Sequence, residues 1–164
     1  MYTEGVLILY TNADTLTNKL NELNTLIKSL QHKPSIIAEV KPKHKWHSNI
    51  NELQIEGYCM FCNNLDNVNS RGDIIYVDKS LHSSEISIET KFSENNFVKI
   101  NSDLVIGNIY RSPGSSEEND SELYDLIQII SKKLVNFMLV GDFNFNDIDW
   151  NKWSSAHNMD RVLS

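Results

Sequence analysis

The sequence predicts an α/β protein in which helices cover sheets of parallel and antiparallel strands. Near the amino terminus, an apolar segment, an amphipathic helix pattern and a second apolar segment follow one another, as in a βαβ unit with parallel strands. Shorter β patterns fill the middle of the chain. A second helix pattern and a last buried strand come after them, so helices and strands share one fold.

The first unit begins with Val6–Tyr10, a short apolar run suited to a strand that is buried on both faces. A helix is predicted from about Thr17 to about Gln31, and Pro34 ends it. Ser35–Val40 is the second strand, with Glu39 near its end. The apolar stripe of the helix consists of Leu16, Leu20, Leu23, Ile27 and Leu30.

The rest of the chain adds more strands and one more helix. Lys41 to Asn51 is a basic, polar loop. The next predicted strands are Gly57–Cys62, Asp73–Val77, Ile86–Ile88, Phe97–Ile100 and Leu104–Tyr110. Ser121 is a suitable N-cap for the second helix. Its buried stripe comprises Leu123, Leu126, Ile127, Ile130 and Leu134, and the strand Phe137–Val140 follows. No linker divides the chain, so we expect one domain over residues 1–164.

Composition narrows the functional class. The 164 residues carry 15 Lys and Arg against 22 Asp and Glu, a net charge of −7, which argues against a non-specific nucleic-acid coat but not against an enzyme that acts on DNA. No apolar run reaches the roughly 18 residues that cross a bilayer, and no secretory signal is present, so we expect an intracellular protein without a membrane partner. Cys59 and Cys62 sit three apart on an alternating strand, which disfavours a shared metal site.

Polar oxygen-bearing side chains cluster where the predicted strands end. They are Asn12 and Asp14, Glu39, Tyr110, and Asp142 with Asn144. Ligands of α/β sheets collect at the carboxyl ends of strands. Carboxylate and amide oxygens are hard ligands that suit Mg²⁺ or Mn²⁺, which in turn bind phosphate. The pattern therefore favours phosphate chemistry, although Asp142 and Asn144 taken alone are also common turn formers.

Four motifs in order resemble the endonuclease/exonuclease/phosphatase superfamily. They are Thr11-Asn12-Ala13-Asp14, Ala38-Glu39-Val40-Lys41, Gly107-Asn108-Ile109-Tyr110-Arg111 and Val140-Gly141-Asp142-Phe143-Asn144, within about positions 6 to 150. The resemblance is strongest to the apurinic-like endonuclease domains of non-LTR (LINE-type) retrotransposons. It implies a four-layer α/β sandwich, here incomplete at the carboxyl terminus.

The resemblance also implies roles for individual residues. Asp142 would orient or deprotonate the attacking water, and Asn144 would hold the phosphate and that carboxylate. Tyr110 would contact the scissile phosphate, and Asn12 would position neighbouring groups of the catalytic set. A phosphodiester attack requires such an activated water together with charge neutralisation. For Tyr110, a buried tyrosine bonded to backbone is the structural alternative.

The remaining implied roles concern the cation and the phosphate. Glu39 and Asp14 would bind Mg²⁺, with Mn²⁺ as an alternative, while Lys41 and Arg111 would contact the substrate phosphate. Lys41 lies in a run of basic residues that could equally be a solvated loop.

Three departures from the family pattern stand out. The strand before Glu39 is about two residues shorter than in relatives, and Asp73 stands where they have a glycine, which we interpret as drift at a hairpin. The chain also ends 22 residues after Asp142, before the Ser-Asp-His segment of relatives. His157 lacks the preceding Asp. Apolar edges should therefore be exposed.

The leading hypothesis is a Mg²⁺-dependent DNA endonuclease domain of a non-LTR retrotransposon, with DNA as its substrate. A reverse transcriptase domain would be its partner in the parent element, and the protein would work in the nucleus. One alternative is a retrotransposon-derived fragment without catalysis. Another keeps the superfamily but changes the substrate to a phosphoinositide, a lipid headgroup or an RNA tail. The sequence does not predict an oligomeric state.

Overall fold

The computed structural model describes residues 5–12, 16–40, 50–63, 72–145, 148–149 and 154–155. The first half contains β1 (Ile8–Asn12), α1 (Leu16–Ser29), β2 (Ile36–Val40), the 3₁₀ turn η1 (Ile50–Leu53), β3 (Tyr58–Asn63) and β4 (Asp73–Asp78). The second half contains β5 (Ser83–Ile86), β6 (Asn95–Ile100), β7 (Leu104–Tyr110), α2 (Glu117–Lys133), β8 (Asn136–Asp142) and the short β9 (Ile148–Asp149) and β10 (Ser154–Ser155).

The longer strands form two mixed four-stranded sheets. The first has the order β1-β2-β4-β3, with β1 and β2 parallel and the other pairs antiparallel. The second has the order β5-β6-β7-β8, with β7 and β8 parallel. In both sheets the parallel pair is joined through a helix, as the long crossover between parallel strands requires. The predicted α/β fold and the amino-terminal βαβ unit are confirmed.

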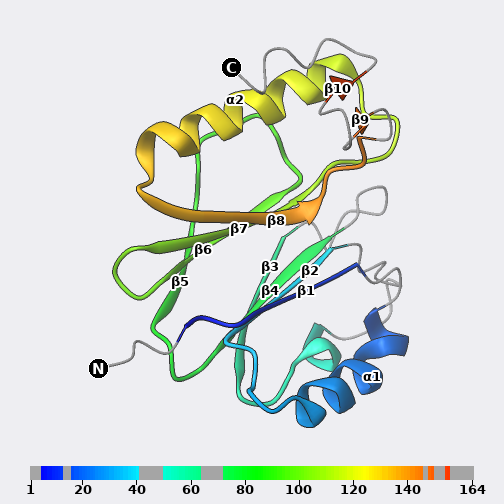
Figure 1. Ribbon diagram of the computed structural model, residues 1–164, viewed down its shortest axis with the longest axis vertical. Helices are drawn as coiled ribbons and strands as arrows, with labels where there is room; N and C mark the ends of the chain where they lie inside the picture. The colour runs from blue at the N-terminus through cyan, green and yellow to red at the C-terminus, as the bar shows by residue number, and fades with distance from the viewer. Residues whose placement is uncertain are drawn as a thin grey trace.

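The elements stack in four layers, with α1 below the first sheet and α2 above the second (Figure 1). Strand alternation gives each sheet one face toward its helix and one toward the other sheet. Side chains from both sheets fill the layer between them, including Ile36, Ile75, Val98 and Ile106. The sandwich therefore has three apolar layers, one under each helix and one between the sheets. Predicted site residues lie at one end of the layer between the sheets.

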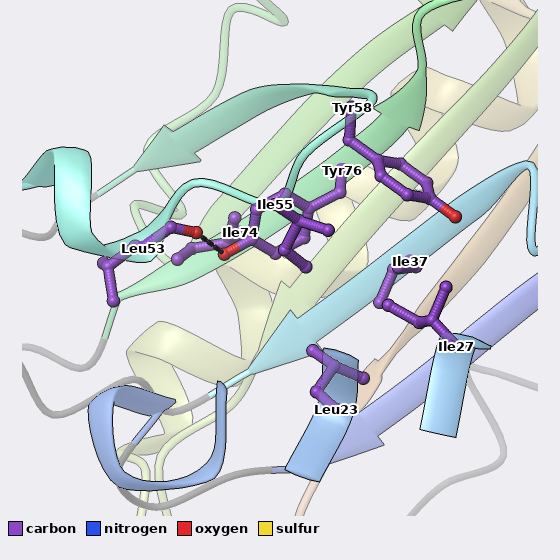
Figure 2. Packing of buried hydrophobic residues seen from close by; sticks show 8 residues of the cluster. All are labelled: Leu23, Ile27, Ile37, Leu53, Ile55, Tyr58, Ile74 and Tyr76. Carbon is purple, nitrogen blue, oxygen red and sulfur yellow. Dashed lines mark hydrogen bonds between the residues drawn. The ribbon is translucent and has the colours of Figure 1, made fainter. Parts of the chain in front are cut away.

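Each helix packs apolar residues of its predicted stripe on its own sheet, but Leu30 lies beyond the end of α1 and is 38% exposed. Leu23 and Ile27 of α1 pack on Ile37 and Ile74 (Figure 2). In the same layer the Tyr76 hydroxyl donates a hydrogen bond to the Leu53 carbonyl at 2.7 Å, so the one polar atom of that ring is satisfied. Leu123, Leu126 and Ile130 of α2 pack on the second sheet with Phe97 and Ile109, which confirms the predicted stripe.

The predicted N-cap of the second helix is wrong. The helix begins at Glu117, and Ser116 caps it by accepting a hydrogen bond from the Asn119 backbone N–H at 3.2 Å, so Ser121 lies inside the helix. The acidic residues of the first turn suit the positive end of the helix dipole and extend the helix upstream of its apolar stripe. Likewise, β5 ends at Ile86 rather than spanning Ile86–Ile88.

Two outer strands leave apolar side chains in water. Among the described strands, β1 and β8 each have a hydrogen-bonded neighbour on one side only. Tyr10 of β1 is 38% exposed, and Leu7, just before β1, is 42% exposed. Met138 of β8 is 47% exposed. The expected exposed apolar edges are therefore present. No helix in the described part of the chain is both long and apolar enough to span a bilayer.

Candidate active site

The candidate site lies at one end of the layer between the sheets. Ile8 of β1 and Val140 of β8 face this layer, so alternation turns Asn12 and Asp142 toward it as well. The Asn12 amide donates a hydrogen bond to Asp142 Oδ2 at 2.9 Å. Two predicted site residues, 130 positions apart in the chain, are thus in direct contact where parallel strands of the two sheets end.

Close packing of β7 against β8 fixes the position of Asp142. Asp142 pairs with Tyr110, and its carbonyl accepts a hydrogen bond from the Arg111 backbone N–H at 2.9 Å. A Cβ on Gly141 would come within 1.9 Å of the Ile109 carbonyl oxygen. Only glycine permits this approach, which explains the glycine before the carboxylate. Tyr110 is fully buried and, by alternation with Ile106, faces the same gap.

Asn144 and Arg111 hold the segment after β8 in place. Asn144 adopts φ 47°, in the left-handed region that asparagine tolerates, and its amide donates to the Arg111 carbonyl at 2.6 Å. In return, Arg111 Nη1 donates to the Asn144 carbonyl at 2.8 Å. The guanidinium also stacks over Phe145 at 4.1 Å and pairs with Asp120 through Nε at 2.6 Å and Nη2 at 3.0 Å. All these contacts of Arg111 are with other residues of the chain. They support a role for Arg111 in positioning the segment after β8, in addition to the phosphate contact that the resemblance implies.

Removing the Asp120 charge should loosen this arrangement. We expect Asp120→Asn to lower the free energy of unfolding by about 2 kcal/mol, because Arg111 is 7% exposed and would remain charged without its bidentate partner. Urea unfolding measures the change. Glu118→Gln is the matched control, since it removes an exposed charge from the same helical turn. Equal effects of the two variants would contradict a role for the Arg111–Asp120 pair.

The structure places Glu39 on a different face from Asp142. Glu39 pairs with Ile74 and alternates with Ile37, and both isoleucines pack under α1. Its carboxylate is fully buried, and neither oxygen has a hydrogen-bond partner among the described residues. Burial raises the pKa of the Glu39 carboxyl to about 8, although Lys19 of α1 lowers it. Glu39 lies this deep because it pairs with Thr11 of β1 and Ile74 of β4 within the sheet.

Several groups at this end of the sandwich escaped the sequence analysis. Burial and the neighbouring Asp142 raise the pKa of Tyr10 to about 12. Three further polar residues are buried and, by strand alternation, face the layer between the sheets: Asp73, Asn96 and Asn108. Asn108 was visible inside the Gly107–Arg111 motif, and Asp73 was visible as the residue that replaces a glycine. Neither pattern signalled burial.

Other predicted residues lie outside the described part of the chain: Asp14, Lys41, His157 and the two tryptophans Trp150 and Trp153. Within the described ranges, no three His, Cys, Asp or Glu side chains converge in a group that could hold a metal ion. Cys59 and Cys62 are both half-buried there. The buried carboxylates that lack hydrogen-bond partners in these ranges are nevertheless hard oxygen donors of the kind that suits a divalent cation.

This architecture is similar to the fold of two solved structures, a retrotransposon endonuclease domain and a 3′ phosphatase. The chain is similar to the endonuclease domain of TRAS1, a telomere-specific non-LTR retrotransposon, with a TM-score of 0.58 and 16% identity over 84% of this chain and 58% of that one. It is also similar to the 3′ phosphatase NExo (D146N) from Neisseria, bound to product DNA hairpin, with a TM-score of 0.61 and 15% identity over 87% and 59%.

These structural likenesses show the fold, and the chain spans less than two thirds of either protein. No protein-family model matches the sequence. No curated protein matches it either.

Proposed function

We propose that this chain carries a divalent-cation-dependent phosphodiesterase site that nicks DNA, in the manner of a non-LTR retrotransposon endonuclease domain. The contact between Asn12 and Asp142 is the observation that carries the proposal. It joins two motifs of the resemblance across the gap between the sheets. The fold itself is that of phosphoesterases, and one of the similar structures is a retrotransposon endonuclease domain.

Asp142 is the proposed base. The Asn12 amide holds its carboxylate in one orientation, and the Arg111 N–H fixes its backbone, so the carboxylate is positioned before a substrate arrives. It would accept the proton of the attacking water. Tyr110, on the paired strand and on the same face, would donate its hydroxyl hydrogen to a non-bridging phosphate oxygen.

Asn144 and Arg111 would set the position of the loop that approaches the phosphate, because each binds the backbone carbonyl of the other. Lys41 is proposed as a further phosphate contact. A bound Mg²⁺ or Mn²⁺ ion would neutralise charge on the phosphate oxygens. Glu39 and Asp14 are the ligands that the resemblance implies, and of these Glu39 faces α1 and not Asp142. In the parent element, a reverse transcriptase domain would use the nicked DNA.

A non-catalytic role is the second candidate. It is favoured by the position of Glu39, whose carboxylate lies under α1 and not beside Asp142. Such a protein would bind DNA without cleaving it, or do neither.

Relaxation of supercoiled plasmid DNA tests the proposal. With Mg²⁺ or Mn²⁺ we expect the chain to convert the plasmid to the open-circular form, and with EDTA we expect no conversion. DNA ending in a 3′ phosphate and a soluble inositol phosphate serve as comparison substrates. Faster turnover of either comparison substrate would indicate the activity of another branch of the superfamily instead of DNA nicking. If none of these substrates is cleaved in a cation-dependent manner, the non-catalytic role is the candidate that remains.

A further inference from the structure

Asp73 lies in the same row of the first sheet as Asn12. Asn12 of β1 pairs with Val40 of β2, and Val40 pairs with Asp73 of β4. The two side-chain positions are thus two strand spacings apart, roughly 10 Å between backbones. Alternation with Ile75, which packs between the sheets, turns Asp73 into the same gap that Asn12 and Asp142 face. Of the two buried carboxylates of the first sheet, Asp73 is therefore the one on the site face, whereas Glu39 is on the α1 face.

Around Asp73 several buried oxygen acceptors come together, with the Asn96 amide as a neighbouring donor. Asn108 donates its amide N–H to the Glu39 carbonyl at 2.9 Å, and its Oδ1 has no hydrogen-bond partner within the described ranges. Asn96 pairs with Asn108 across β6 and β7 and donates its amide to the Phe61 carbonyl at 3.1 Å. Both carboxylate oxygens of Asp73 are buried and lack a hydrogen bond of ordinary geometry to any described residue.

Such an arrangement requires a positive group. A buried carboxylate without a partner is strongly unfavourable, so it binds either a proton or a cation. Burial raises the pKa of Asp73 well above its usual range; the nearby Asn96 amide lowers it, and Glu94 raises it further. A proton on Asp73 would neutralise that carboxylate alone. A divalent cation satisfies several oxygens at once, and Mg²⁺ is commonly held by one or two carboxylates plus water.

We propose that Asp73, together with Asn108 Oδ1, binds the divalent cation of this protein from the gap between the sheets. Asp73 thereby supplies the carboxylate that the sequence pattern assigns to Glu39, whose side chain lies on the α1 face of the sheet. The inference rests on the proposed function, because that function supplies the need for a cation. The inference also assigns a role to Asp73, the aspartate that stands where the family pattern has a glycine.

Paramagnetic line broadening by Mn²⁺ locates the ion in the unmodified chain. At a small molar fraction of Mn²⁺, we expect the backbone amide signals of Asp73, Asn96 and Asn108 to broaden first. An ion held by Glu39 would instead broaden Lys19, Leu20 and Leu23 of α1, which lie on the other side of the first sheet (Figure 1). Stronger broadening of the α1 signals would overturn the inference, as would uniform broadening of both groups.

Calorimetric titration with Mn²⁺ then tests the side chain. Asp73→Asn should weaken Mn²⁺ binding by at least about tenfold. Asp103→Asn is the matched control, since it removes the same charge from an exposed residue in the turn between β6 and β7, and it should bind Mn²⁺ as the wild type does. Unchanged affinity in Asp73→Asn would mean that a proton, not a cation, satisfies this carboxyl, and the inference would be wrong.

The two proposals can fail separately. Mn²⁺ bound at Asp73 without any phosphodiester cleavage would refute the proposed function and leave the cation site standing. Cation-dependent nicking that Asp73→Asn does not alter, with Mn²⁺ bound elsewhere, would refute the cation site and leave the proposed function standing. If Asp73→Asn does not fold, the broadening experiment on the unmodified chain still decides.

Discussion

Asp142→Asn is expected to slow cation-dependent DNA nicking by about 10²–10⁴-fold, the usual contribution of a positioned general base. An asparagine side chain has nearly the same shape and can still accept the hydrogen bond from Asn12, so the site geometry should persist. It cannot take a proton from water at neutral pH. The loss should therefore appear in the rate of plasmid relaxation at saturating Mg²⁺.

Two controls separate lost chemistry from lost structure. Asp103→Asn makes the same substitution at an exposed residue near the opposite end of β7 and should nick DNA at the wild-type rate. The urea midpoint of Asp142→Asn should stay close to that of the wild type. If Asp142→Asn retains full nicking activity, Asp142 is not the base, and the main step of the proposed function is wrong.

Glu39→Gln should stabilise the protein above pH 5, and the gain should grow as the pH rises. Glu39 has a usual carboxyl pKa near 4.5 in the unfolded chain and a pKa of about 8 in the fold, where burial disfavours the charged form. Between these values the unfolded chain has released the proton and the folded chain keeps it. Wild-type stability thus falls by up to about 1.4 kcal/mol per pH unit, and the loss is complete once the pH passes about 8.

The measurement is urea unfolding in EDTA at several pH values from about 5 to about 8.5, which brackets the window between the two pKa values. The difference between Glu39→Gln and the wild type should be small near pH 5 and largest near pH 8, because glutamine does not titrate. Glu56→Gln, which changes an exposed glutamate near the amino end of β3, should show no such trend. A difference that stays constant with pH would show that Glu39 is ionised in the fold.

The order and type of most elements were predictable from local patterns. The apolar runs, the two helical stripes and the proline after α1 each reflect short-range physics, which is why β1, α1, β2 and α2 were expected close to where they lie. The motifs also placed polar residues at strand ends. Parallel strands present those ends at one edge, so the contact between Asn12 and Asp142 agrees with the expected clustering.

The sequence by itself determined which side chains share a face of a strand, since alternation has a period of two. It showed that Glu39 shares a face with Ile37, and that Asp73 shares one with Ile75. Only the tertiary structure decided which of those faces meets a helix and which meets the other sheet, because that choice depends on how whole layers pack. The result sets Glu39 under α1 and Asp73 in the gap with Asn12 and Asp142, at positions that no local pattern distinguishes.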